Sequence, residues 1–415
     1  MQLRPFTGTY LIDPALVWRE LLNAPQDAHF ADDLGLWLIS RHEHVRRAFA
    51  DAATFGNALT LAPVYQMCPE ALAVVMRLDV PPTTAAADSP VHTRTRRALR
   101  ATFANTGPRV ADQYGPIVRR RVDELVAGIA ARRGAVVDLV GEFAALLPLL
   151  VVVDILGVPE RDVPRIRSWA DGQIGLIWGR PEPAEQVRLA QGLLDFWRYC
   201  QGLVARRMTE GAAGDDFVSR ALRHRGGDDA VLTPAEIASM AFNLLVAGHE
   251  TTAGLLAHGL DQALSVPGRW SDLAARPEAV PAFLEEVLRF APAIDGWLRV
   301  TLRPLTIGGV TIPAGARCLL LIGAANRDPA AFADPDRFDP TRAGGRGHLS
   351  FGYGPHFCIG ATLAHLEARI ALVRLAEAMP ELRLASGHQS RFKPNLAFRA
   401  HRTLLVTQPR SSQRT

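Results

Sequence analysis

Apolar residues recur three and four positions apart along most of the chain, and this spacing predicts a mainly helical protein. The clearest case begins with Thr-Pro-Ala-Glu at Thr233, a capping-box pattern with proline at the first helical position. Pro267 and Gly268 end it, so the pattern predicts one helix over about 234–265. Such a helix would be about 48 Å long. Since it is apolar around most of its circumference, we expect it at the centre of the fold.

Strand-like stretches are few and short. LGLWLIS, at 34–40, and LTIGGVTIPAGARCLLLIG, at 305–323, alternate or cluster β-branched and apolar residues around glycine turns. Short loops rich in Gly, Pro and Asp separate the helical patterns, without an internal repeat or a low-complexity linker. We therefore expect a mainly α fold with a minor β-sheet region, forming a single domain over residues 1–415.

The composition is that of an ordinary globular protein, with 48% hydrophobic and 21% charged residues among 415. Neither a signal sequence nor an apolar run of membrane-spanning length is apparent, so we expect a cytoplasmic protein without membrane contact. The net charge is +4 and the arginines are dispersed. Since no dense basic run interleaves with aromatic residues, nucleic-acid binding is disfavoured. We expect a monomer.

The four cysteines are far apart and form no CxxC pair, which argues against a disulfide framework or a thiolate zinc cluster. Cys358 stands out in the stretch FGYGPHFCIG. Gly352 and Gly354 permit a tight backbone path, and Cys358 falls near the first turn of a predicted helix, where N–H groups and the helix dipole stabilise a thiolate. A nucleophile would need a positioned base such as His356. No cysteine-hydrolase signature surrounds it, so an iron ligand facing a flat macrocycle fits better.

The stretch AGHETT, at 247–252, lies midway along the predicted central helix. The zinc-protease pattern H-E-x-x-H fails because Ala253 occupies the second histidine position. What remains is a costly buried acid, Glu250, beside threonines whose hydroxyls can bond the carbonyl four residues back and leave a polar notch. The plain alternative is a salt-bridged glutamate with satisfied core threonines.

Two further motifs are weak when taken alone. Glu286 and Arg289 form E-x-x-R in an apolar helical stretch at 281–292, which suggests a buried pair, with Arg337 as a candidate third member. His92 and Arg96 lie one helical turn apart, so they either face solvent or share an anion. The plain alternative is that His92, Arg96 and other basic side chains of this kind form a solvated face and bind no anion.

Taken together and in this order, the motifs resemble those of the cytochrome P-450 superfamily. The segment from Phe351 to Gly360 resembles its haem-binding signature, F-G-x-G-x-H-x-C-x-G. AGHETT, E-x-x-R and the upstream histidine–arginine pair are similar to its other conserved stretches. The resemblance runs from about Trp18 to Leu405. It implies a haem b cofactor (iron protoporphyrin IX) and a haem-thiolate monooxygenase that activates dioxygen.

The resemblance also implies residue roles. Cys358 would be the axial iron ligand, Phe351 would shield its sulfur, and Thr251 and Glu250 would be the acid–alcohol pair that delivers protons. Glu286, Arg289 and Arg337 would brace the haem-binding loop. The haem and its propionates would be held by a set of cofactor-binding residues: His92, Arg96, Ala247, Arg299, Phe351, Gly352, His356, Cys358 and Gly360.

The substrate is expected to be largely apolar and of medium to large size, hydroxylated or epoxidised in natural-product biosynthesis. The residues expected to line its pocket are Trp178, Ala247, Ile294 and Trp297, although each could equally be core. No GxGxxG fingerprint occurs, so electrons from NAD(P)H would arrive through separate proteins, a ferredoxin and a ferredoxin reductase. Arg97 and Arg100 are the expected docking cations. The alternatives are a peroxide-using peroxygenase and a non-catalytic haem-binding protein.

Overall fold

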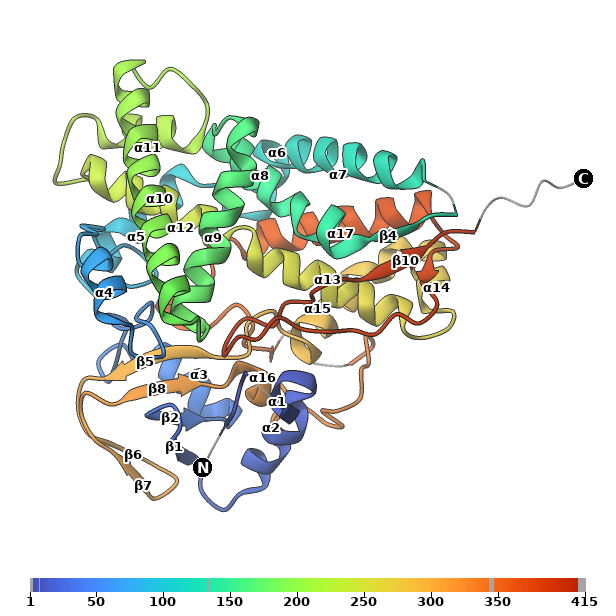
Figure 1. Ribbon diagram of the computed structural model, residues 1–415, viewed down its shortest axis with the longest axis horizontal. Coiled ribbons are helices and arrows are strands. Elements are labelled where there is room, and N and C mark those ends of the chain that lie inside the picture. Colours follow the sequence, from blue (N-terminus) through green and yellow to red (C-terminus); the bar gives the residue numbers. More distant parts are fainter. Residues whose placement is uncertain (1–2, 7, 133, 343–346, 410–415) are drawn as a thin grey trace, which may run out of the picture.

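A computed structural model describes residues 3–6, 8–132, 134–342 and 347–409. Helices form one large body and a five-stranded sheet lies beside it (Figure 1), which confirms the predicted mainly α fold with a minor sheet. In chain order the longer helical elements are α1 (Gly8–Ile12), α2 (Pro14–Asn23), α3 (His42–Ala50), α4 (Pro69–Val75), α5 (Val91–Thr102), α6 (Gly107–Gln113), α7 (Gly115–Ala130), α8 (Leu146–Leu156), α9 (Val163–Trp178), α10 (Pro183–Thr209), α11 (Phe217–Arg225), α12 (Pro234–Ala247), α13 (Glu250–Leu264), α14 (Arg269–Ala275), α15 (Val280–Phe290), α16 (Ile322–Ala325) and α17 (Ala361–Ala378).

Short turns of other helix types connect them: η1 (Val140–Ala144), η2 (Glu160–Asp162), η3 (Pro277–Ala279) and η5 (Gly354–His356). The strands are β1 (Ala28–Ala31), β2 (Leu36–Ile39), β3 (Phe55–Gly56), β4 (Val136–Asp138), β5 (Trp297–Thr301), β6 (Leu305–Ile307), β7 (Val310–Ile312), β8 (Arg317–Leu320), β9 (Arg383–Leu384) and β10 (Leu405–Thr407).

The main sheet has the strand order β1-β2-β8-β5-β3. Its β2 and β8 pair in parallel, with Leu38 opposite Leu319, while the remaining neighbours are antiparallel. The two predicted strand regions both supply strands, because β2 lies within 34–40 and β6, β7 and β8 lie within 305–323. The β6–β7 hairpin turns at Gly308 and Gly309, whose φ angles of 52° and 79° favour glycine.

The core of the helical body surrounds α13. Every residue of α13 from Thr252 to Leu260 is buried, as a helix that is apolar on most sides requires. It packs against α8, α15 and α17. The N-terminus of α12 has the predicted capping box, in which Thr233 accepts from the Glu236 N–H and Glu236 accepts from the Thr233 N–H. Within the described residues, no helix combines the length and the apolar character needed to cross a membrane.

Candidate functional site

The central helix is interrupted at the AGHETT stretch. The prediction of one helix over 234–265 was wrong, because α12 ends at Ala247 and α13 begins at Glu250. The Thr251 hydroxyl donates to the Ala247 carbonyl at 2.9 Å, so it takes the acceptor that a continuous helix would offer to a backbone N–H. Gly248 fits this break since a Cβ there would lie 2.7 Å from the Leu244 carbonyl oxygen. The polar notch expected from the threonines is present.

The acid of this stretch, Glu250, is held in a buried polar environment. The Nε2 atom of His249 lies 3.4 Å from its Oε1, and the His249 side chain is 1% exposed. His249 donates through Nδ1 to the Leu245 carbonyl at 2.8 Å. Burial alone would raise the pKa of Glu250, but interactions with His249 and Asp171 hold it below its usual range. Glu250 is therefore a buried, ionised acid one residue before Thr251.

The cysteine loop precedes α17 and is shaped by its own backbone. The Cys358 N–H donates to the Phe351 carbonyl at 2.9 Å, and Gly352 and Gly354 adopt φ angles of 70° and 72°. A Cβ on Gly354 would lie 3.0 Å from the Cα of Ala50. Both glycines are thus required by conformation, and the second also by its contact with α3.

Cys358 differs from the two buried cysteines, Cys200 and Cys318, because it is an accessible residue. Desolvation by the surrounding protein nevertheless raises the pKa of its thiol. The N–H groups of Gly360 and Ala361 and the charge of Arg96 lower that pKa. The backbone N–H groups at the start of α17 therefore point at the sulfur and offset part of the desolvation, although the pKa of the thiol stays raised rather than lowered as expected from the sequence.

Phe351 lies partly buried beside this loop. Its ring centroid is 6.3 Å from that of Phe357 and 5.1 Å from that of His365 on α17. It therefore packs between the cysteine loop and the helix that follows. This placement is compatible with the expected shielding of the sulfur.

Two arginines and two histidines from three segments meet near the loop. The rings of His92 and His356 stack with centroids 3.9 Å apart. Arg96 donates to the Phe357 carbonyl. Arg299 is 3% exposed. The pKa of His356 is lowered by burial, by His92 and, to a smaller extent, by the charge of Arg299. The carboxylate of Asp88 raises the pKa of both His92 and Arg299, against the effect of burial. The plain alternative of a solvated basic face fails for His92 and Arg299, because both are buried.

The residues present fit the expected haem. The Nε2 atom of His92 and the Nε atom of Arg96 are buried and lack a hydrogen-bond partner. Buried donors of this kind call for acceptors, and two carboxylates would satisfy them. Ala247 is exposed although α12 and α13 run through the middle of the helical body (Figure 1), so one side of the break is not packed against protein. An accessible thiol, a cationic edge and an open helix face match a flat dicarboxylate cofactor.

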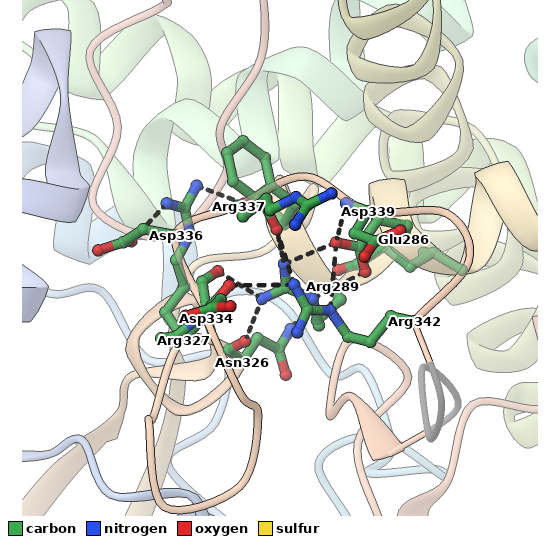
Figure 2. Close-up of polar contacts among 12 residues, drawn as sticks. Glu286, Arg289, Asn326, Arg327, Asp334, Asp336, Arg337, Asp339 and Arg342 are labelled. Carbon is green, nitrogen blue, oxygen red and sulfur yellow. Dashed lines mark hydrogen bonds and ion pairs between the residues drawn. The ribbon is translucent and has the colours of Figure 1, made fainter.

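A buried ionic network joins α15 to the segment before the cysteine loop (Figure 2). Arg289 is 0% exposed and binds Glu286 through Nε and Nη2, both at 2.8 Å. Its other N–H groups reach the carbonyls of Asn326, Pro335 and Arg337. The five donors of the guanidinium are thereby satisfied.

The third member of this network differs from the prediction. Arg337 contributes its backbone carbonyl, whereas the side-chain ion pair to Glu286 comes from Arg342, with Nε 3.5 Å from Oε1. Arg342 could not be predicted from the sequence, because its contact depends on how the loop folds back onto α15. The same holds for Asn326, whose side chain accepts from the Leu349 N–H at 2.7 Å and donates to Ser350 at 2.9 Å. Through Asn326 the network reaches the start of the cysteine loop.

Of the residues expected to line the substrate pocket, some are packed in the core and others face open space. Trp178 is 1% exposed, stacks on Trp297 at 5.6 Å and belongs to an apolar core cluster. Trp297 and Ile294 are partly buried, and Ile294 forms an isolated β-bridge with Phe398. Ala247 faces open space beside Thr251. The core interpretation thus suits Trp178, and the pocket interpretation suits Ala247.

Comparison with known proteins agrees with the resemblance. The family model described as Cytochrome P450 matches residues 261–378. The chain is 34% identical over 388 residues to the Vitamin D(3) 25-hydroxylase of Pseudonocardia autotrophica, covering 92% of this chain and 90% of the relative. It is 33% identical to the Erythromycin C-12 hydroxylase of Saccharopolyspora erythraea, covering 82% of this chain and 81% of the relative.

A solved structure shows the same fold. The cytochrome P450 CREJ in complex with (4-ethylphenyl) dihydrogen phosphate superposes with a TM-score of 0.91 and 32% sequence identity. The match covers 97% of this chain and 98% of that one. The similarity therefore includes the sheet and the helical body together.

Proposed function

Because this chain belongs to the cytochrome P450 family and is a monooxygenase of that family, we propose that it hydroxylates a largely apolar organic molecule of medium to large size at a haem ligated by Cys358. The balanced reaction takes one dioxygen, two electrons and two protons, and gives the alcohol and one water. The observation that carries the proposal is the accessible Cys358 thiol, aligned with backbone N–H groups at the start of α17 and bordered by partnerless cationic donors.

Cys358 would hold the haem iron through its thiolate. The bound haem supplies dioxygen activation, which a thiolate ligand favours by donating electron density to the iron. The chain contributes groups that favour the ionised sulfur, although burial raises the pKa of the thiol overall. The N–H groups of Gly360 and Ala361 and the charge of Arg96 all stabilise the thiolate against the desolvation that opposes it.

The cationic edge would bind the two haem carboxylates. His92, Arg96, His356 and Arg299 come from α5, the cysteine loop and β5. Burial lowers the pKa of Arg299 to about 10, with Asp88 opposing the shift. Even at that value its guanidinium stays charged at neutral pH. Charge-assisted hydrogen bonds to buried carboxylates would relieve the desolvation of these cations.

Proton delivery would use the break between α12 and α13. The Thr251 hydroxyl donates to the Ala247 carbonyl and still has lone pairs with which to accept a hydrogen bond. Glu250 is the adjacent acid, and its Oε1 lies 3.4 Å from Nε2 of the buried His249. In this assignment Thr251 orients water at the open helix face and Glu250 relays protons to it.

The names of two relatives support the substrate class. One relative is named for vitamin D(3) and the other for erythromycin, both large organic molecules. A role in natural-product biosynthesis is proposed on the same ground. Ala247, on the open face of α12, would contact the substrate, and Ile294 and Trp297 would border it. Epoxidation of a double bond is possible with the same residues.

Electrons would come from NAD(P)H through a separate ferredoxin and its reductase. Arg97 and Arg100 are exposed on α5, the helix whose Arg96 contacts the carbonyl of Phe357 beside the cysteine. Phe357 and Tyr353 are exposed aromatic residues of the same loop, at 45% and 37%. A cationic rim around an apolar centre suits an acidic electron carrier.

The first test is the carbon monoxide difference spectrum of the reduced protein. A strongly red-shifted Soret band in the wild type that is absent in C358H, with haem still bound, is the expected result. A band at the position of histidine-ligated haem in the wild type would contradict ligation by Cys358. Substrate-dependent NAD(P)H consumption with a matched amount of hydroxylated product then separates a monooxygenase from a haem protein without catalysis. Turnover driven far better by peroxide would indicate a peroxygenase.

A further inference from the structure

Three ionisable side chains from separate elements meet at the break in the central helix. Asp171 comes from α9, His249 precedes α13, and Glu250 is the first residue of α13. One ligand-type atom of each lies within 4.8 Å of the other two. The carboxyl group of Asp171 is within hydrogen-bonding reach of Glu250. Asp171, which is far from Glu250 and Thr251 in the sequence, thus contacts Glu250 directly.

The hydrogen-bond roles of this cluster are constrained by its surroundings. His249 uses its Nδ1 proton for the Leu245 carbonyl, so a neutral imidazole presents a lone pair at Nε2. Oδ1 of Asp171 is buried without a donor, and Nε2 of His249 also lacks a hydrogen-bond partner. Two ionised carboxylates and an imidazole lone pair repel one another at this separation. At least one proton, or a cation, must therefore lie among them.

The other charged group that acts on the cluster is Lys393. It is exposed and belongs to the segment that follows β9, so it faces the cluster from the solvent side. One lysine offsets one of the two carboxylate charges. The second charge is left for a proton on Asp171 or His249.

The expected proton affinities agree with this geometry. Burial, together with the contact with Glu250, raises the pKa of Asp171 to about 7. Burial would raise the pKa of Glu250, but the contacts with His249 and Asp171 outweigh burial and hold that pKa low. Burial opposes protonation of His249, but Glu250 raises its pKa above the usual value. Near neutral pH the cluster therefore carries a proton that is readily exchanged.

We propose that Asp171 is a positioning residue for proton delivery, which shares a proton with Glu250 and thereby keeps that acid supplied beside Thr251. This inference rests on the proposed function and adds a residue to it. It also gives α9 a part in the chemistry. Since Asp171 is the contribution of α9, a displacement of that helix would separate the two carboxyl groups and interrupt the supply.

Infrared spectroscopy of the holoenzyme tests the shared proton without turnover. We expect a carboxylic acid C=O band that titrates near pH 7 in the wild type and disappears in D171N. Asp295 is another fully buried acid whose pKa is raised to about 7, so D295N is the matched control and should keep the Asp171 band. D171E, which retains a carboxyl group, should restore a titrating band. A wild-type spectrum unchanged by D171N would overturn the proposal.

Turnover supplies an independent readout. D171N should lower kcat at least tenfold and enlarge the solvent isotope effect, while substrate affinity from the spin-state titration stays within twofold. The control E182Q changes an exposed acid just before α10 and should match the wild type. An unaltered kcat and pH profile in D171N would overturn the proposal, as would stoichiometric zinc in the purified protein that D171N removes. A red-shifted carbon monoxide band in D171N would confirm that the proposed haem ligation survives in either case.

Discussion

The imidazole rings of His92 and His356 stack with their planes 29° apart, although one lies on α5 and the other in the cysteine loop. Stacking brings two groups that can both become cationic into contact, and burial with the neighbouring charge lowers the pKa of His356 to about 4. The arrangement is therefore unfavourable for two imidazolium ions and favourable for two neutral donors. It marks the edge at which the carboxylates of a haem would be bound.

Loss of one cation at this edge should weaken haem retention. R299Q removes a buried guanidinium whose Nη1 atom donates to the Leu298 carbonyl at 2.8 Å. A charge-assisted hydrogen bond contributes about 1.5–3 kcal/mol, so the haem should transfer to apomyoglobin about 10 to 150 times faster. The control R303Q changes an exposed arginine four residues further along, beyond the end of β5, and its transfer rate should equal that of the wild type. Equal rates in both variants would contradict the assignment of Arg299.

The network around Glu286 should respond to Arg342 rather than to Arg337. R342Q removes the ion pair with Glu286, whereas R337Q leaves in place the backbone carbonyl that accepts from Arg289. We expect R342Q to lower the free energy of unfolding by about 1–3 kcal/mol and R337Q to change it little. Urea denaturation of the two variants measures both values. A larger loss of unfolding free energy in R337Q than in R342Q would show that the side chain of Arg337 stabilises the network in solution.

R289K tests how far this network depends on geometry. Lysine keeps the charge but cannot form the two parallel bonds to Glu286 or reach the three carbonyls. Because the pair is fully buried, we expect a loss of about 3–5 kcal/mol. Denaturation with and without haem measures it, and a loss below about 1 kcal/mol would contradict the structural role.

The interruption of the central helix should depend on Gly248. In G248A the new Cβ would meet the Leu244 carbonyl oxygen at 2.7 Å and Val152 at 3.1 Å. Overpacking of this kind costs about 1–3 kcal/mol. G259A is the matched control on α13, since its Cβ meets nothing closer than 3.8 Å and alanine favours a helix by about 1 kcal/mol. Thermal denaturation should therefore show G248A below the wild type and G259A at or above it.

Several residues of the candidate site interact with neighbours close in the sequence, and local motifs can predict contacts of this kind. The N–H groups of Gly360 and Ala361 interact with the sulfur of Cys358, and the hydroxyl of Thr251 donates to the carbonyl of Ala247. The continuity of the central helix was mispredicted since apolar spacing says nothing of a hydroxyl that competes for a carbonyl. The contacts of Asp171 and Arg342 were missed for another reason. Each depends on long-range packing that no spacing along the chain encodes.

Asp295 gives the protein a predictable response to pH. Burial raises its pKa to about 7, with Arg399 and Arg327 opposing the shift. A raised pKa means that the folded state binds the proton more tightly. The contribution of this group is fully present below about pH 4 and is lost as pH rises to about 7. D295N, which cannot ionise, should therefore gain stability relative to the wild type between these values, by about 4 kcal/mol at most. Urea denaturation at pH 5 and pH 8 measures the difference, and a pH-independent difference would contradict it.

The exposed arginines of α5 should govern the arrival of electrons. Reversing their charge in R97E/R100E would place two acids beside the cysteine loop and repel an acidic carrier. We expect the rate of reduction by a ferredoxin to fall at least tenfold at low salt and to lose most of its dependence on ionic strength. Reduction by dithionite should be unchanged, which would show that the haem itself is intact. R383E is the control, because Arg383 lies on β9, next to β10, which Figure 1 shows at the end of the molecule opposite α5. If R383E slowed reduction as much as R97E/R100E, net charge rather than a docking surface would control the encounter.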